Sequence, residues 1–187
     1  MKISNALKLM MLLALVSSEA AAGATPLKID SAKSTVSAVF KQIGVAVESR
    51  FMKFGAQIDF DAANPDASKA TVDIDIASFD LGDPDYNREV LKKEWFNAAQ
   101  FPKASFVSTK IRGNGPGKLE VSGKLTIKGK TTEVSFPMSV KKEGAVQIFE
   151  GNLPIRRLTF NIGDGEWKDT SVVADEVVIR FRVLAKP

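Results

Sequence analysis

The sequence contains neither cysteine nor histidine. The usual ligands of zinc, haem and copper are therefore missing, as are thiol nucleophiles and histidine-based catalytic triads. Disulfides cannot form, so an exported domain must be stabilised by its hydrophobic core alone. The remaining carboxylates, lysines, hydroxyls and single tyrosine show no grouping of nucleophile, base and orienting residue. We therefore expect no metal site and no enzyme activity.

Long apolar runs are also lacking, and the one short run lies near the N-terminus. Two lysines precede about eight apolar residues from Leu9 to Val16, well short of the roughly 20 that a spanning helix needs. Small residues follow as far as Ala24, which is typical of a signal peptide. We predict a signal peptide over 1–24, with Ala22 as the alternative cleavage site, and a mature domain over 25–187.

Strong charge of either sign is absent as well. The net charge of the 187 residues is +4, and the basic residues are dispersed along the chain. Such a balance gives no indication of a nucleic-acid partner. Internal repeats, low-complexity stretches and linkers are not visible in the sequence, so we expect one domain.

From Ser34 onward, apolar and polar residues alternate in short runs, as in strands with one apolar face. Asp73 and Asp75, for example, alternate with apolar residues and should face water. We expect strands at about 34–41, 45–61 (long and bent), 69–77, 103–113, 117–127, 130–141, 146–158 and 173–184. Short connections predict an all-β antiparallel meander closed into an eight-stranded barrel, although a two-sheet sandwich fits the same strands.

One segment departs from the alternating pattern. Asp83 is a suitable helix N-cap, and Pro84 suits the first helical position. The residues from Asp85 to Trp95 then predict one short helix, between the third and fourth strands.

Apolar side chains of one parity should face the barrel interior. Periodicity alone favours a solid, packed core, but the same residues could line a cavity for a prenyl or acyl chain. The candidate lining residues are Val36, Ala38, Phe40, Phe54, Phe60, Ile74, Ile76, Phe106, Leu125, Phe136, Met138, Ile179 and Phe181.

Several short motifs occur in a characteristic order over most of the chain. They are Arg50-Phe51 with Phe54-Gly55, Ala77-Ser78-Phe79, Trp95-Phe96-Asn97 with Phe101-Pro102, Gly123 to Gly129, and Phe160-Asn161-Ile162-Gly163 with Glu166-Trp167. This set resembles the YceI-like family, the lipocalin-like polyisoprenoid-binding proteins of bacteria. The resemblance implies an extended lipocalin-like barrel with one helix, a periplasmic location and a homodimer.

The resemblance also implies a ligand, an isoprenoid quinone or polyprenyl lipid held without a covalent cofactor. A protein of this kind would sequester or carry the lipid, and its head group would contact a few polar residues at the mouth. Our candidates are Tyr86, Asn87, Arg157 and Trp167. Asn87 and Trp95 also resemble a subgroup found with cytochrome b561-type membrane proteins. The alternative function is therefore an accessory to such a redox enzyme, with a stress-related role.

Overall fold

A computed structural model describes residues 23–187 of the chain. The predicted signal peptide lies outside the described residues, except for its last two positions. Within residues 23–187, eleven strand segments form one sheet, in which neighbouring strands pair antiparallel. The segments are β1 Thr25–Ile29, β2 Thr35–Gln42, β3 Val45–Phe51, β4 Phe54–Phe60, β5 Lys69–Asp75, β6 Phe79–Asp80, β7 Lys103–Gly113, β8 Lys118–Ile127, β9 Lys130–Glu143, β10 Val146–Arg156 and β11 Val173–Lys186.

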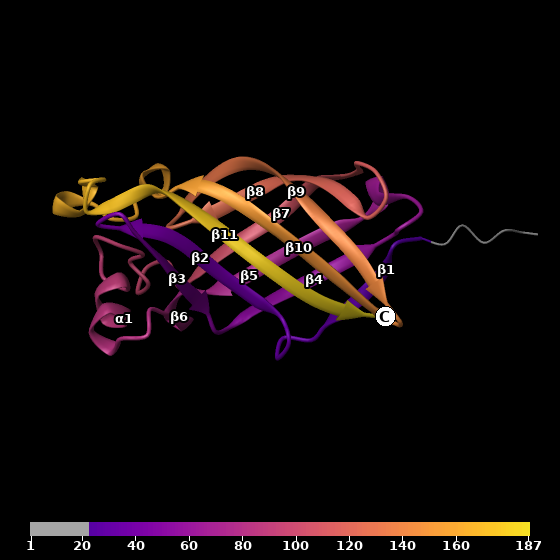
Figure 1. The fold of residues 1–187 in the computed structure, drawn as a ribbon, viewed down its shortest axis with the longest axis horizontal. Coiled ribbons are helices and arrows are strands. Elements are labelled where there is room, and N and C mark those ends of the chain that lie inside the picture. The colour runs from indigo at the N-terminus through magenta and orange to yellow at the C-terminus, as the bar shows by residue number, and fades with distance from the viewer. Residues whose placement is uncertain (1–22) are drawn as a thin grey trace, which may run out of the picture.

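The sheet closes on itself because β1 pairs with β4 on one side and with the end of β11 on the other. Consecutive strands pair from β7 through β11, and they wind diagonally around an elongated barrel (Figure 1). Three of the barrel strands are interrupted, and each consists of two consecutive segments: β1 with β2, β3 with β4, and β5 with β6. Counted in this way the barrel has eight strands. The predicted barrel is confirmed, and the sandwich alternative is wrong.

The break between β3 and β4 lies beside the break between β5 and β6. The backbone N–H of Met52, between β3 and β4, donates to the carbonyl of Ser78 at 3.0 Å, and that of Lys53 donates to the Ser78 hydroxyl at 2.9 Å. A short 3₁₀ helix, Ile76–Ser78, separates β5 from β6. At this level β6 pairs with β3, whereas β5 pairs with β4 and β7. The chain between β6 and β7 supplies the wall where strand pairing is interrupted.

That connecting chain contains the helix α1, Pro84–Val90. Asp83 caps it as predicted, because its carboxylate accepts from the backbone N–H groups of Asp85 and Tyr86. The predicted extent to Trp95 is wrong. Beyond Val90 the chain forms irregular turns, in which the Phe96 N–H donates to the Val90 carbonyl at 3.0 Å. These turns bring large apolar side chains toward the barrel. No helix within 23–187 is long and apolar enough to cross a membrane.

Other predicted boundaries also needed correction. The expected strand 45–61 is divided at Met52 and Lys53, and the expected strands 69–77 and 146–158 end early. A 3₁₀ helix, Ile76–Ser78, follows β5, and another, Arg157–Phe160, follows β10. The short strands β1 and β6 were not predicted, since each is too brief to show a clear alternation.

Candidate functional site

The barrel interior contains a first hollow with a volume of about 150 Å³. Inward residues from strands on all sides of the barrel surround it, and Ser105 is the one polar residue among them. Small side chains such as Ala56, Ala70 and Ala104 leave room between larger ones. Such a lining can hold an apolar molecule, but it offers almost no hydrogen-bonding groups.

A second hollow, of about 360 Å³, borders α1 through Tyr86, Glu89 and Val90. The helix lies at one end of the barrel (Figure 1). The walls of this hollow come from β2, β3 and β11, from the 81–96 segment and from the loop that follows β10. The tip of the β2–β3 hairpin is nearby, because the Ile43 N–H donates to the Val172 carbonyl at 2.8 Å. Ile43, Val45 and Tyr86 are strongly exposed there. Exposed apolar side chains therefore lie close to this hollow, and Gln42, Glu89 and Arg157 are among its polar lining residues.

A single layer of side chains separates the two hollows. Phe51, Phe96, Ile127 and Ile179 border both of them. The rings of Phe51 and Phe96 meet edge to face with centroids 6.4 Å apart, and Phe79 packs against both rings. We call the residues that border both hollows, Phe51, Phe96, Ile127 and Ile179, the waist. The two hollows are therefore neighbours inside the barrel.

The structure distributes the predicted lining residues between the hollows. Ala38 and Phe40 border the second hollow, Ile179 borders both, and Phe54 borders neither but packs against the core. The remaining candidates all border the first hollow: Val36, Phe60, Ile74, Ile76, Phe106, Leu125, Phe136, Met138 and Phe181. Whether these side chains contact a ligand stays a prediction.

The head-group candidates are divided as well. Tyr86, Arg157 and Trp167 border the second hollow, but Asn87 does not. The Asn87 side chain instead holds the loop before α1. Its Oδ1 accepts from the Leu81 N–H at 2.7 Å, and its Nδ2 donates to the Asp80 carboxylate at 3.0 Å.

Arg157 is only 2% exposed, and all five of its N–H groups are used by the protein itself. They donate to the carbonyl oxygens of Ile162, Gly163, Trp167, Val173 and Ala174 at 2.7–3.2 Å. Burial lowers the pKa of this guanidinium, and the nearby Asp175 carboxylate opposes that shift. Arg157 therefore organises the loop between β10 and β11, and it has no donor left for a head group.

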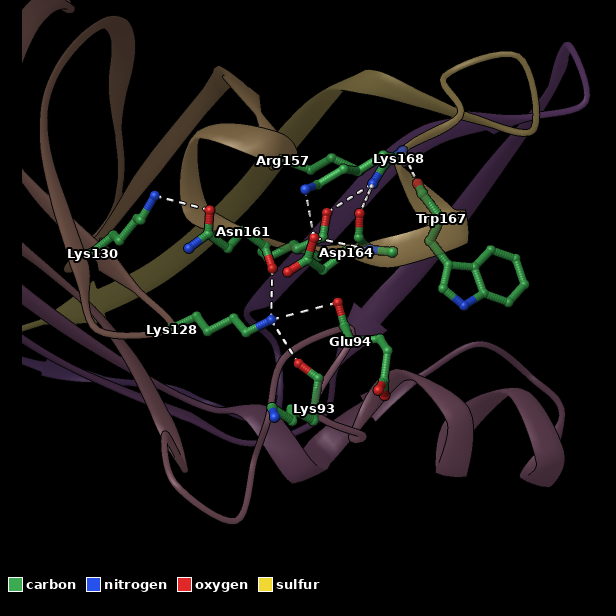
Figure 2. Close-up of polar contacts among 12 residues, drawn as sticks. Lys93, Glu94, Lys128, Lys130, Arg157, Asn161, Asp164, Trp167 and Lys168 are labelled. Carbon is green, nitrogen blue, oxygen red and sulfur yellow. Dashed lines mark hydrogen bonds and ion pairs between the residues drawn. The ribbon is translucent and has the colours of Figure 1, made fainter.

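A second cationic side chain ties that loop to the segment after α1 (Figure 2). Lys128, in the turn between β8 and β9, donates to the carbonyls of Lys93 at 2.8 Å and Asn161 at 2.6 Å. The Glu94 carbonyl accepts from the backbone N–H groups of Gly163 and Asp164. Desolvation lowers the pKa of Lys128, while the charges of Asp164 and Glu94 raise it. Three connections that are distant in sequence thus hold one another at this end of the barrel.

Comparison with known proteins places this architecture in a family. The model of the YceI-like domain matches residues 27–185, nearly all of the described chain. The chain belongs to the YceI-like family. The solved structure of Burkholderia cenocepacia BcnA superposes with a TM-score of 0.83 at 53% identity, covering 85% of this chain and 100% of BcnA.

More distant relatives resemble the chain in sequence or in fold. A UPF0312 protein of Vibrio cholerae is 32% identical over 126 residues, which span 66% of this chain and 67% of that protein. A UPF0312 protein of Shewanella oneidensis is 32% identical over 98 residues, about half of each chain. A polyisoprenoid binding domain from Saccharophagus degradans has a TM-score of 0.68 at 16% identity, covering 87% of this chain and 98% of that domain. At that identity the likeness concerns the fold.

Sequence reasoning missed one polar group in the site of this YceI-like protein. Trp95 borders the second hollow, and its Nε1 is buried without a hydrogen-bond partner among residues 23–187. In the sequence, Trp95 carries only a family resemblance, through the Trp95-Phe96-Asn97 motif and together with Asn87. A buried Ser49 hydroxyl also lacks a partner in the described chain, but Ser49 borders neither hollow. No cluster of acidic residues within 23–187 is arranged to hold a metal ion.

Proposed function

We propose that this YceI-like protein is a periplasmic binding protein that sequesters or carries an isoprenoid lipid inside its barrel. The observation that carries the proposal is the pair of adjoining apolar hollows separated only by the waist. Each buried CH₂ contributes about 0.8 kcal/mol, so a long tail binds firmly without polar contacts. The polyisoprenoid binding domain of Saccharophagus degradans, which shares the fold, adds support.

The sizes of the hollows indicate how such a tail would lie. An apolar cavity of about 150 Å³ accepts a molecule the size of benzene, and the first hollow has about that volume. A polyprenyl chain is far larger, so it must pass from the second hollow through the waist into the first. Binding therefore requires the waist side chains to rotate, and the length of the channel limits the length of the tail.

The apolar lining favours binding over catalysis. Among the polar residues that border the second hollow, Glu89 is paired with Lys92, and the donors of Arg157 are all engaged. The Arg157 bonds hold the loop between β10 and β11, so Arg157 could not donate a proton without breaking them.

Native mass spectrometry of the protein purified from its own periplasm tests the proposal. We expect a bound species with a polyprenyl mass, and a mass corresponding to the empty protein after gentle purification would contradict it. Ile179→Phe should obstruct the waist and shift the bound population to shorter tails. Val178→Phe is the matched control, because Val178 precedes Ile179 on β11 and borders neither hollow. It should leave the tail-length distribution unchanged.

The cytochrome b561-type partner, the stress-related role and the homodimer stay predictions. Affinity purification from native membranes tests the partner, because a carrier of a redox-active lipid must deliver it to a membrane enzyme. Sedimentation velocity of the mature domain tests the dimer.

A further inference from the structure

The hairpin formed by β2 and β3 ends in apolar side chains that the protein leaves exposed. Ile43 is 74% exposed and Val45 is 67% exposed. Gln42, at the end of β2, borders the second hollow, as does Tyr86 on α1, which is itself 60% exposed. The tip of this hairpin and α1 lie at the same end of the barrel (Figure 1). The exposed apolar side chains therefore stand next to the second hollow.

The backbone at the tip does not favour an isoleucine. The turn between β2 and β3 consists of Ile43 and Gly44, with φ angles of 49° and 77°. Two-residue turns with positive φ at both positions usually contain Asn-Gly or Asp-Gly, and a β-branched residue in this conformation is an outlier. Within 23–187, the other non-glycine residues with positive φ are Asn97, Lys128 and Asn161, none of which is β-branched. Neither backbone preference nor burial explains the isoleucine.

The hairpin formed by β8 and β9 has the same turn with a polar residue. Its two residues are Lys128 and Gly129, with φ angles of 48° and 73°. Lys128 donates to the carbonyls of Lys93 and Asn161, so its side chain holds the fold together. Ile43 is not among the residues of the described chain that pack against the core. Its apolar side chain therefore acts outside the fold.

The size of the exposed surface indicates what covers it. Ile43, Val45 and Tyr86 together can bury only a few hundred Å², since even an aromatic side chain buries about 150–250 Å². A stable protein interface buries about 800 Å² per partner. A lipid bilayer needs no such area and no complementary shape, and tyrosine suits its interface. The exposed Lys41, close to the tip on β2, adds one positive charge that attracts lipid head groups.

We propose that the tip of the β2–β3 hairpin, Ile43 with Val45, inserts into the surface of a lipid bilayer and docks the protein there. Docking in this orientation places the end of the barrel that contains the second hollow against the membrane. The inference rests on the proposed function and names the bilayer as the partner with which the barrel exchanges its lipid. A long apolar tail is costly to expose to water, so exchange at a membrane surface avoids that step.

The test is flotation of the mature protein with vesicles of phosphatidylcholine, alone or mixed with phosphatidylglycerol, and without isoprenoids. The variant combines Ile43→Asn with Val45→Thr. Asparagine tolerates positive φ and threonine suits a strand, so the fold should be at least as stable. We expect the wild type to float with both kinds of vesicle. The variant should partition at least about tenfold more weakly, because burying one aliphatic side chain already accounts for such a factor.

Val107→Thr is the matched control, because Val107 is 47% exposed on β7 and borders neither hollow. It should leave the partition unchanged. A wild type that floats with neither kind of vesicle, or a variant that floats equally well, would overturn the inference. Self-association that is lost in the variant while flotation is unchanged would assign the tip to a second copy of the chain. A polyprenyl mass without flotation rejects docking alone, whereas flotation without a bound lipid rejects the proposed function.

A second measurement locates the inserted residue. The chain has no cysteine, so Ile43→Cys provides a single site for a fluorophore that responds to apolar surroundings. Ala145→Cys is the control, because Ala145 is exposed in the turn before β10, which begins beside the end of β11, whereas Gln42 pairs with the start of β11. Phosphatidylcholine vesicles should shift the emission of the label at position 43 to the blue and leave the label at position 145 unchanged. Equal responses at both positions would contradict the inference.

Discussion

The guanidinium carbon of Arg157 lies 5.9 Å from the ring centroid of Trp95, and both side chains border the second hollow. Arg157 belongs to the connection between β10 and β11, whereas Trp95 belongs to the turns after α1. A cation over an indole face is attracted by the ring quadrupole. This contact joins two walls of the site that are more than sixty residues apart in sequence, so a change on either wall should affect the other.

Replacing Arg157 by lysine should destabilise the fold strongly. Lysine has three donors instead of five, so at least two buried carbonyls would lose their partners. At about 1–2 kcal/mol each, the expected loss in the free energy of unfolding is roughly 2–4 kcal/mol. Urea unfolding measures it. Arg156→Lys is the control, because its side chain is 80% exposed, and a change there within about 0.5 kcal/mol is expected. Similar results for both variants would contradict the role given to Arg157.

A methyl group at Gly151 should reduce both stability and ligand capacity. A Cβ there would lie 2.5 Å from Cζ of Phe181, a ring that borders the first hollow. The ring would have to move, which should cost roughly 1–3 kcal/mol. Gly151→Ala should therefore lower the urea midpoint and shorten the longest tail seen by native mass spectrometry. Gly55→Ala is the control, because its added Cβ meets no atom within 4 Å. An unchanged ligand distribution in Gly151→Ala would argue against the tail reaching Phe181.

The barrel could be predicted from sequence because each long strand repeats its alternation over many residues. In β8, for example, Leu119, Val121, Leu125 and Ile127 are all buried, as their shared parity requires. The short strands, the end of α1 and the division at Met52 depend on contacts with distant segments. Local pattern gives little information about such contacts.

The candidate site was less predictable for the same reason. The inward parity of β5 and β9 anticipated which residues border the first hollow, such as Ile74 and Met138. The same approach could not show that the N–H groups of Arg157 are all hydrogen-bonded to carbonyl oxygens between β10 and β11 and at the start of β11. It also could not show that the Nε1–H donor of Trp95 has no hydrogen-bond partner among residues 23–187. Both facts depend on where the loops after α1 and β10 meet.

Acid should remove the contribution that Asp80 makes to stability. Hydrogen bonds from Asn87 and from the Gly82 backbone lower the pKa of this carboxyl below its ordinary value of 3.8. The folded state thus binds the proton less readily than the unfolded state, so the stabilisation is present above pH 3.8. It is lost as the pH falls through the folded-state pKa. Thermal melts of the wild type and Asp80→Asn should differ at neutral pH and converge in this acid range. A difference that stays constant with pH would contradict the argument.

Two buried serines on neighbouring strands should respond oppositely to alanine substitution. Ser49 on β3 is 1% exposed, and its hydroxyl has no partner among residues 23–187. Ser37 on β2 is 4% exposed and donates to the Glu48 carboxylate at 2.9 Å. Removing a buried hydroxyl that makes no hydrogen bond is neutral or stabilising, whereas removing a bonded one costs about 1 kcal/mol or more.

Ser49→Ala should therefore keep or raise the free energy of unfolding of the ligand-free protein, and Ser37→Ala should lower it. Urea denaturation of both variants, with equal m-values as a check on two-state behaviour, makes the comparison. If Ser49→Ala were as destabilising as Ser37→Ala, the Ser49 hydroxyl must be bonded to a buried water. Such a water would occupy the inward side of β3 between Val47 and Phe51. Those two residues border the second hollow, so the water would lie next to the path of the tail.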